Sequence, residues 1–340
     1  MNLNIIGNGF DLYHGLPSSY FYFGSYLIEN NHSLYDELSE MYGFRKGIYS
    51  GFPCDDFYYA VEDIFWRDFE SHLGELNSLW VQETLIDDLD LEYDDAIDLE
   101  MYQYNNANDI KKALSDWMND IVDKKENYNI ILEKMKIGKF KLRLSKKDFY
   151  ISFNYTHMLE EIYKVNDDNI LHIHGEATEE DSLVIGHGND TVINDIKKDL
   201  EEYEEESFDQ ASRNRENELK CMLHNLKELR KDVDWYMKRC NTFLSEMPCK
   251  PEKVQVYGLS MGTVDLPYLE SIRKKWPDIK WRFSYYSESE IDKIKSIAEK
   301  DLELQKGQYK LFYFSNSYWE DIQEEIVELQ KIERYKKIFV

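Results

Sequence analysis

The sequence predicts an α/β protein with a mainly parallel sheet, three layers and long helical insertions. Short apolar segments, each followed by glycine or polar turn residues, recur at the start, middle and end of the 340-residue chain. Helical stretches separate these segments, and strands interleaved with helices usually pair in parallel. Several segments are apolar almost throughout, which is typical of strands covered on both faces. The expected strands are 3–6, 149–153, 170–173, 183–185, 253–257, 280–285 and 310–314.

These strands fall in three separate stretches of the chain. We expect residues 1–54, 148–192 and 250–318 to form one α/β nucleotide-binding core, and residues 319–340 to form a C-terminal helix. Residues 55–147 and 193–249 are then two helical insertions, since apolar residues recur in them every three or four positions.

The first insertion carries Ile110, Leu114, Trp117 and Ile121 at helical spacing, besides an acidic run at 87–100. The second insertion opens on the acidic residues 201–206, and a single apolar stripe follows them. We expect that stripe to lie on one long helix that packs on another helix of the same chain, and the acidic runs to be solvated. The stripe consists of Leu219, Met222, Leu226, Leu229, Val233, Tyr236, Cys240 and Phe243.

The charge of the chain bears on its partners. There are 67 acidic and 41 basic residues, and the formal net charge is −26, which repels phosphate backbones, so we expect no nucleic-acid partner. The four cysteines form no CxxC pair and predict no zinc module. The N-terminus has no basic segment before an apolar one, and no apolar run is long enough to span a bilayer. We therefore expect a cytoplasmic protein without membrane contact.

A glycine-rich turn directly follows the first predicted strand. Gly7, Asn8, Gly9, Phe10 and Asp11 form it, and two glycines one residue apart let backbone N–H groups approach an anionic ligand. Asp11 is suited to capping the next helix or to contacting a ribose hydroxyl. Leu12 stands where a dinucleotide fingerprint has its third glycine, which disfavours a hydride-transferring dehydrogenase. The alternative is a plain strand-to-helix turn.

Two further turns follow predicted strands. Asn154 and Thr156 come after strand 149–153, where an asparagine amide can hold a hydroxyl or a water; a turn or helix cap is the alternative. Gly258, Ser260 and Asp265 follow strand 253–257. Residues 258–262 match G-x-S-x-G, but no histidine follows Ser260, so a hydrolase triad in the usual order is excluded. Ser260 is then a ligand-binding hydroxyl.

Histidines occur near the ends of two predicted strands. His172 and His174 alternate on one strand and His187 ends the next, a pattern compatible with a metal site. No carboxylate lies at matching spacing, so we expect no metal. His174 precedes a glycine and is the candidate general acid or base, because the pKa of histidine lies near neutrality.

Taken together, these segments resemble the AbiH family of phage abortive-infection proteins. The match rests on residues 5–12, 14–17 with Tyr20, 153–156 with 159–160 and 162–163, 173–175, 186–188, and 257–260 with Asp265. The resemblance spans both ends of the chain and implies a role in phage defence.

A looser resemblance is to sirtuin-type NAD-binding domains, which implies a Rossmann-like, sirtuin-like core. Gly7 to Gly9, Asn154, His174 with Gly175, and residues 258–261 occur in the same order. Thr156 stands in place of an aspartate and the zinc cysteines are missing, which argues against deacetylation.

This resemblance implies NAD as the substrate. The first turn would hold phosphates and ribose, Asn154 a ribose or a water, and His174 would relay a proton as the nicotinamide–ribose bond breaks. The alternatives are a non-enzymatic nucleotide sensor that signals to a defence partner or a homo-oligomer, and a metal-dependent hydrolase.

Overall fold

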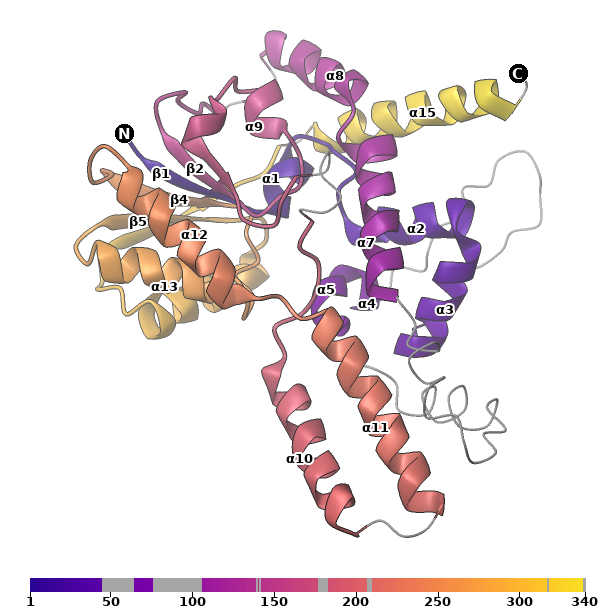
Figure 1. Ribbon diagram of the computed structural model, residues 1–340. Coiled ribbons are helices and arrows are strands. Elements are labelled where there is room, and N and C mark those ends of the chain that lie inside the picture. Colours follow the sequence, from indigo (N-terminus) through magenta and orange to yellow (C-terminus); the bar gives the residue numbers. More distant parts are fainter. Residues whose placement is uncertain are drawn as a thin grey trace. The chain divides into compact units, whose positions relative to one another are not determined.

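Figure 1 shows the computed structural model of the chain, which describes residues 1–44, 64–75, 106–138, 140, 142–176, 183–206, 210–316 and 318–338. Cys54 and the acidic run 87–100 lie outside the described residues. The chain divides into two units. The first contains residues 1–19, 115–184 and 232–340, and the second contains residues 20–114 and 185–231. In the part of the chain that the structure describes, no helix is long and apolar enough to cross a membrane.

A six-stranded sheet, in which every neighbouring pair is parallel, forms the centre of the first unit (Figure 1). The strand order is β3-β2-β1-β4-β5-β6. The prediction of an α/β fold with a mainly parallel sheet is therefore confirmed. The strands are β1 (Leu3–Ile6), β2 (Phe149–Ser152), β3 (Ile170–His172), β4 (Lys253–Tyr257), β5 (Lys280–Tyr285) and β6 (Tyr309–Tyr313).

The strand expected at 183–185 is wrong, because this segment is bonded to a loop instead of to a strand. The Val184 N–H donates to the His174 carbonyl at 2.9 Å, and the Val184 carbonyl accepts from the Tyr155 hydroxyl at 3.1 Å. The apolar residues of the segment are buried without pairing, which explains why they resemble a strand in the sequence.

One face of the sheet is covered by the helices that follow β4 and β5 and by the helix before β4. These are α12 (Val233–Glu246), α13 (Leu266–Lys275) and α14 (Ile291–Ser296), which continues through a wider turn, η7 (Ile297–Asp301). Val254, Val256 and Phe283 point from the strands into the same hydrophobic cluster as Cys240, Leu269 and Ile294 from the helices. Burial of these side chains is the main stabilising contribution on this face.

The opposite face packs against α1 (Asn8–Tyr13) and the segment that begins with α9 (Met158–Glu161). Phe10 of α1 contacts Tyr257 of β4 edge-on at 6.4 Å and lies 5.8 Å from the Tyr163 ring. Tyr13 stacks on Phe314 at 4.2 Å, after β6. Helices therefore lie on both faces of the sheet. Both α8 (Lys125–Lys136) and α15 (Trp319–Ile338) belong to the same unit, and their Lys134 and Glu325 side chains form an ion pair.

Helices make up the described part of the second unit, and aromatic side chains form much of its core. Phe23 of α2 meets Trp66 and Phe69 edge-on, and Tyr35 of α3 stacks on Trp66. The helices are α2 (Tyr20–Asn30), α3 (His32–Tyr42), α4 (Ile64–Arg67), α5 (Phe69–His72), most of α7 (Asn106–Trp117), α10 (Asp190–Glu206) and α11 (Gln210–Glu228).

The expected long helix in the second insertion is two helices. The first, α11, ends at Glu228, and α12 starts at Val233, where the Asp232 side chain caps it by accepting a hydrogen bond from the Trp235 N–H. Between them, the Leu229 carbonyl and the Lys231 N–H bond to the backbone of His187. The apolar stripe serves two cores, because Leu219 and Leu226 pack against α10, whereas Cys240 packs against the sheet.

The later part of the first insertion contains the expected helix, α7 (Asn106–Trp117). Residues Ile110, Leu114 and Trp117 are buried along α7, and Ile121 lies in the wider turn η3 (Met118–Val122) that continues it. Such widened turns are rare and often occur at functional sites. Asp123 directly follows this turn.

Candidate functional site

The predicted site residues follow strands that are neighbours in the sheet. In a parallel sheet all carboxyl ends lie on one edge, and β3, β2, β1 and β4 are adjacent in that order. The segments that carry Asp11, Asn154, His174 and Ser260 therefore begin at the same edge of the first unit. The strand order reverses between β1 and β4, and ligands of open α/β sheets often bind at such a reversal.

The turns after β1 and β4 are packed backbone against backbone. The Gly7 N–H donates to the Tyr257 carbonyl at 2.9 Å, and the Gly9 N–H donates to the Gly258 carbonyl at 2.8 Å. A Cβ atom on Gly9 would lie 2.7 Å from the Gly258 Cα, and one on Gly7 would lie 2.5 Å from the Leu259 Cα. The glycines are therefore needed for this close approach, and the Gly9 N–H is already engaged within the chain.

On the β2 side of β1, side chains from the loop after β2 meet α1 and the turn that precedes it. The Thr156 hydroxyl donates to Oδ2 of Asp11 at 2.7 Å, and the Asn154 amide donates to the Gly7 carbonyl at 3.1 Å. Asp11, Asn154 and Thr156 are only 1%, 4% and 3% exposed. Oδ1 of Asp11 and Oδ1 of Asn154 are buried and have no hydrogen-bond partner in the protein. Two acceptor oxygens are thus left for donors from another molecule.

Burial raises the pKa of Asp11 to about 7, although the hydrogen bond from Thr156 and the polar Asn154 amide nearby lower it. The negative charges of Asp123 and Glu160 also raise this pKa. A carboxyl with a pKa near neutrality can both accept and release a proton at the pH of a cell, as acid–base catalysis requires.

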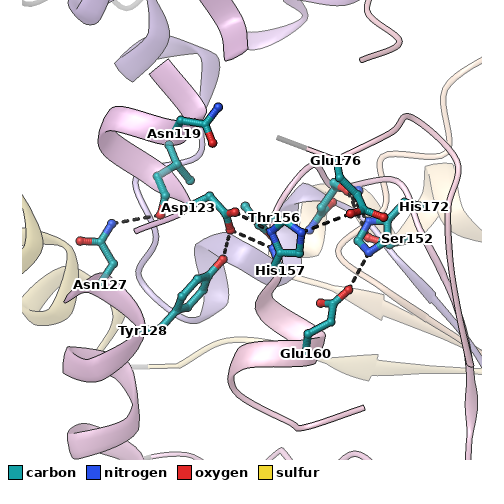
Figure 2. Close-up of polar contacts among 12 residues, drawn as sticks. Asn119, Asp123, Asn127, Tyr128, Ser152, Thr156, His157, Glu160, His172 and Glu176 are labelled. Carbon is teal, nitrogen blue, oxygen red and sulfur yellow. Dashed lines mark hydrogen bonds and ion pairs between the residues drawn. The ribbon is translucent and has the colours of Figure 1, made fainter. Parts of the chain in front are cut away.

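Beside this carboxyl lies a hydrogen-bonded group of acidic and imidazole side chains, shown in Figure 2. His157 Nδ1 is 2.6 Å from Oδ2 of Asp123, and the His157 N–H donates to the other oxygen of the same carboxylate at 2.8 Å. The Tyr128 hydroxyl also donates to Asp123. On the other side of the ring, Nε2 of His157 is 3.3 Å from Glu176. The hydrogen bond to Asp123 raises the pKa of His157 to about 9, against the opposing effect of burial.

A second imidazole, His172, stands in a similar setting (Figure 2). Its Nε2 lies 2.8 Å from Oε1 of Glu160, and its Nδ1 lies 3.3 Å from the Asn154 carbonyl. Burial is the largest single effect and lowers the pKa of His172, but the hydrogen bond and charge of Glu160, the charge of Glu176 and the bond to the Asn154 carbonyl together outweigh it, so the net shift is upward. Both nitrogens of each histidine face oxygen acceptors, an arrangement that favours the imidazolium form. Oε2 of Glu160 is buried without a partner.

The remaining predicted residues form hydrogen bonds with local partners. Asn8 donates to the Ser18 carbonyl at 2.9 Å and accepts from the Ser18 hydroxyl at 2.6 Å. After β4, Ser260 donates weakly to Asp265 at 3.4 Å, and the Gly262 N–H donates to the same carboxylate at 3.2 Å. Phe10 packs in the aromatic cluster against the sheet, as described above.

His174 has a different setting from His172. Its ring lies edge-on to Phe153 at 5.3 Å and 6.3 Å from the Tyr155 ring. The strand β3 ends at His172, so strict alternation along a strand does not relate the two histidines. His187 belongs to the second unit, where its Nε2 is 2.9 Å from the Leu226 carbonyl and burial lowers its pKa.

No metal site was found within the described residues, where no group of three or more histidine, cysteine, aspartate or glutamate side chains is placed to hold an ion. The acid–base groups that the sequence did not reveal are Asp123, His157, Glu160 and Glu176. His157 and Glu160 lie just after the Asn154 turn, so proximity to that turn was a usable signal. The sequence around Asp123 gave no such signal, because its partner His157 lies 34 residues away.

Comparison with known proteins agrees with the motifs. A family model described as bacteriophage abortive infection AbiH matches residues 3–285. The chain belongs to the AbiH family. This range includes every strand of the sheet except β6 and all the residues of the candidate site. The family description assigns AbiH proteins to phage abortive infection. Neither curated proteins nor solved structures gave a match, and the similarity to sirtuin-type domains stays a prediction.

Proposed function

We propose that this AbiH protein acts in abortive infection by binding a nucleotide at the carboxyl ends of β1 and β2. We further propose that it hydrolyses NAD there at the nicotinamide–ribose bond. The observation that carries the proposal is the pair of buried, unpartnered oxygens of Asp11 and Asn154. A buried acceptor without a donor is destabilising by about 1–3 kcal/mol, and a ligand that supplies hydroxyl donors relieves this.

A ribose fits this requirement by its chemistry. Its 2′- and 3′-hydroxyls are two neighbouring donors on adjacent carbons, and Asp11 and Asn154 each have one free acceptor. The Asn154 amide and the Thr156 hydroxyl are held by bonds to Gly7 and Asp11, so the acceptors are fixed before a ligand arrives. Fixed acceptors favour binding because less conformational entropy is lost.

The sheet supports a dinucleotide in particular. The strand order 3-2-1-4-5-6 is the order of doubly wound sheets that bind dinucleotides at the carboxyl edge. The opening glycine turn lies at this edge, but its Gly9 N–H is bonded to Gly258. We therefore assign the ribose contacts to Asp11 and Asn154, and we retain Gly7, Asn8, Gly9, Phe10, Gly258, Ser260 and Asp265 as the predicted lining for the rest of the nucleotide.

Hydrolysis of this bond passes through an oxocarbenium-like ribose, which positioned hydroxyls and an activated water stabilise. In this proposal Asn154 holds the ribose or the water, and His174 is the predicted proton relay. Loss of NAD would deprive an infected cell of redox cofactor, which accords with abortive infection as a strategy.

The test is release of nicotinamide from NAD by the purified full-length chain, followed by chromatography. We expect release by the wild type, a loss of at least about 100-fold in Asn154→Ala and in His174→Ala, and no change in Asn166→Ala. Asn166 is an exposed asparagine of the same unit and serves as the matched control. Binding of NAD without release would favour the alternative, a non-enzymatic nucleotide sensor. Neither binding nor release would exclude both.

A further inference from the structure

Besides the histidine–carboxylate pairs described above, other buried titratable side chains occur in the described part of the chain. A buried pair, His14 and Tyr163, lies in the aromatic layer, and an ion pair of Lys231 with Glu70 lies in the second unit. In both pairs the two side chains bond to each other, so we assign them a role in stability. Asp11 differs from them, because one of its carboxylate oxygens is buried and unpartnered at the candidate site.

We infer that Asp11 is the general base of the site, with Thr156 as the residue that positions its carboxylate. This inference rests on the proposed hydrolysis of NAD. The sequence suggested only a cap or a ribose contact for Asp11. The side chain does not cap a helix, since it lies inside α1 and its Oδ2 accepts from Thr156.

The geometry leaves one oxygen for chemistry. Thr156 fixes Oδ2 at 2.7 Å, and Oδ1 remains without a partner beside Asn154. Each of these oxygens has two lone pairs, so a water between Oδ1 of Asp11 and Oδ1 of Asn154 can donate one hydrogen to each oxygen while the ribose hydroxyls donate to the second lone pairs. The lone pair of this water then points away from both oxygens. In this role Asn154 holds the water and Asp11 accepts its proton.

The reaction step balances without a further reactant. The water oxygen bonds to the anomeric carbon of the ribose as the carbon–nitrogen bond breaks, and the bonding electron pair stays on the pyridinium nitrogen. Nicotinamide therefore leaves as a neutral molecule and needs no proton. The proton of the water passes to Oδ1 of Asp11 and then to solvent, with His174 as the predicted relay for this second transfer. The step thus calls for a base, and Asp11 supplies a carboxylate at the site.

Charged and polar groups around Asp11 set the pH range in which it works. Within its own unit, Asp123 follows η3 and Glu160 lies on α9, and both raise its pKa, whereas Thr156 and Asn154 lower it. The imidazoles His157 and His172 pair with Asp123 and Glu160 and so balance these charges. The result is a carboxyl whose pKa of about 7 leaves a large ionised fraction at neutral pH.

Part of this cluster is exposed to solvent, whereas Asp11 is buried. The side chains of Glu176 and His157 are 39% and 22% exposed, while Asp11 is 1% exposed. Substrate therefore reaches Oδ1 only when side chains over it move. Such opening is common for sites that exclude water during the reaction.

The closing experiment measures nicotinamide release from NAD between pH 5 and 9. For the wild type we expect kcat/KM to rise with pH through about 7 as Asp11 ionises. Thr156→Val removes a hydrogen bond that lowers the pKa of Asp11, so the rise should move upward by about one pH unit. Asp11→Asn should lose at least about 100-fold in kcat, with folding checked by circular dichroism. Asp292→Asn, at a 98% exposed carboxyl, is the control.

The outcomes separate the two claims. A shifted profile in Thr156→Val together with loss in Asp11→Asn supports the inference, because a merely structural Thr156 would leave the shape of the pH profile unchanged. An active wild type with an unshifted profile in Thr156→Val, or with activity retained in Asp11→Asn, overturns the base assignment and leaves the proposed function standing. No release by the wild type at any pH overturns both.

Discussion

Thr156 and Asp11 lie 145 residues apart in the chain, and their side chains are joined by a hydrogen bond of 2.7 Å in the interior of the first unit. This bond ties the loop after β2 to the helix after β1. It also holds a carboxyl group in a place where few polar groups are tolerated, because burial of its charged form is unfavourable. The stability of the protein should therefore depend on the protonation of Asp11.

The sign follows from the raised pKa. Asp11 binds its proton more tightly in the folded chain, with a pKa of about 7, than in the unfolded chain, with a pKa near 3.8. Its contribution to stability is present below about pH 4 and is lost as the pH rises through about 7. Asp11→Asn cannot ionise, so we expect it to be more stable than the wild type at pH 8 by about 1–3 kcal/mol and similar at pH 4.

Urea unfolding at the two pH values measures this difference. The exposed control Asp292→Asn should follow the wild type at both. An identical difference between Asp11→Asn and the wild type at pH 4 and pH 8 would show that Asp11 titrates normally.

His157 should titrate well above an ordinary histidine. Its hydrogen bond to Asp123 raises its pKa to about 9, so the imidazolium form stabilises the fold below about pH 6.5, and this contribution is lost as the pH rises through about 9. In Asp123→Asn the midpoint should fall toward 6.5. Nitrogen-15 NMR of the histidine rings measures the His157 midpoint in the wild type and in Asp123→Asn. A wild-type midpoint near 6.5 would contradict the Asp123–His157 pairing.

The close packing of the turns after β1 and β4 makes a prediction for Gly258. Its φ is +61°, and a Cβ atom there would lie 2.3 Å from the Phe10 nitrogen and 2.4 Å from the Gly9 carbonyl carbon. We expect Gly258→Ala to reduce the free energy of unfolding by at least about 3 kcal/mol. Gly262→Ala is the matched control in the same loop, because its Cβ would meet only the Asp265 carboxylate at 4.0 Å. Equal thermal stability of the two variants would argue against the packed turns.

Tyr163 carries a buried hydrogen bond that its hydroxyl alone can make. The hydroxyl is 2.6 Å from Nε2 of His14, whose Nδ1 is 2.7 Å from the Phe10 carbonyl. Burial lowers the pKa of His14 to about 4, so the ring is neutral and needs one donor and one acceptor. Tyr163→Phe leaves one ring nitrogen unsatisfied and should lower stability by about 1–3 kcal/mol. The same change at Tyr286, which is 55% exposed, should have little effect on the unfolding midpoint.

The sheet was predictable because several of its strands are short and mostly apolar. Segment 3–6 is buried throughout, and burial on both faces leaves an almost continuous apolar run in the sequence. Segment 183–185 is equally apolar but is bonded to a loop, so composition alone misassigned it. The apolar stripe of the second insertion runs without interruption across the break between α11 and α12, so the pattern predicted one helix. The break depends on Asp232 capping α12, and this role depends on the local backbone conformation.

The site was predictable only in part. Glycine, asparagine and threonine after strands 3–6 and 149–153 indicated a shared edge, since parallel strands end together. The unusual state of Asp11 depends on its burial beside Asp123 and Glu160, which come from distant elements. No local pattern in the sequence encodes that proximity. His157 was overlooked because its partner, Asp123, is contributed by the helical insertion.

Equilibrium binding of NAD, measured by titration calorimetry at pH 7, tests the central claim most directly, because it depends on the site and not on turnover. We predict binding to the wild type and to Asn166→Ala, and an affinity at least about tenfold weaker for Asn154→Ala, which corresponds to about 1.4 kcal/mol. Absence of binding to the wild type, or equal affinity in Asn154→Ala, would contradict a nucleotide site at Asp11 and Asn154.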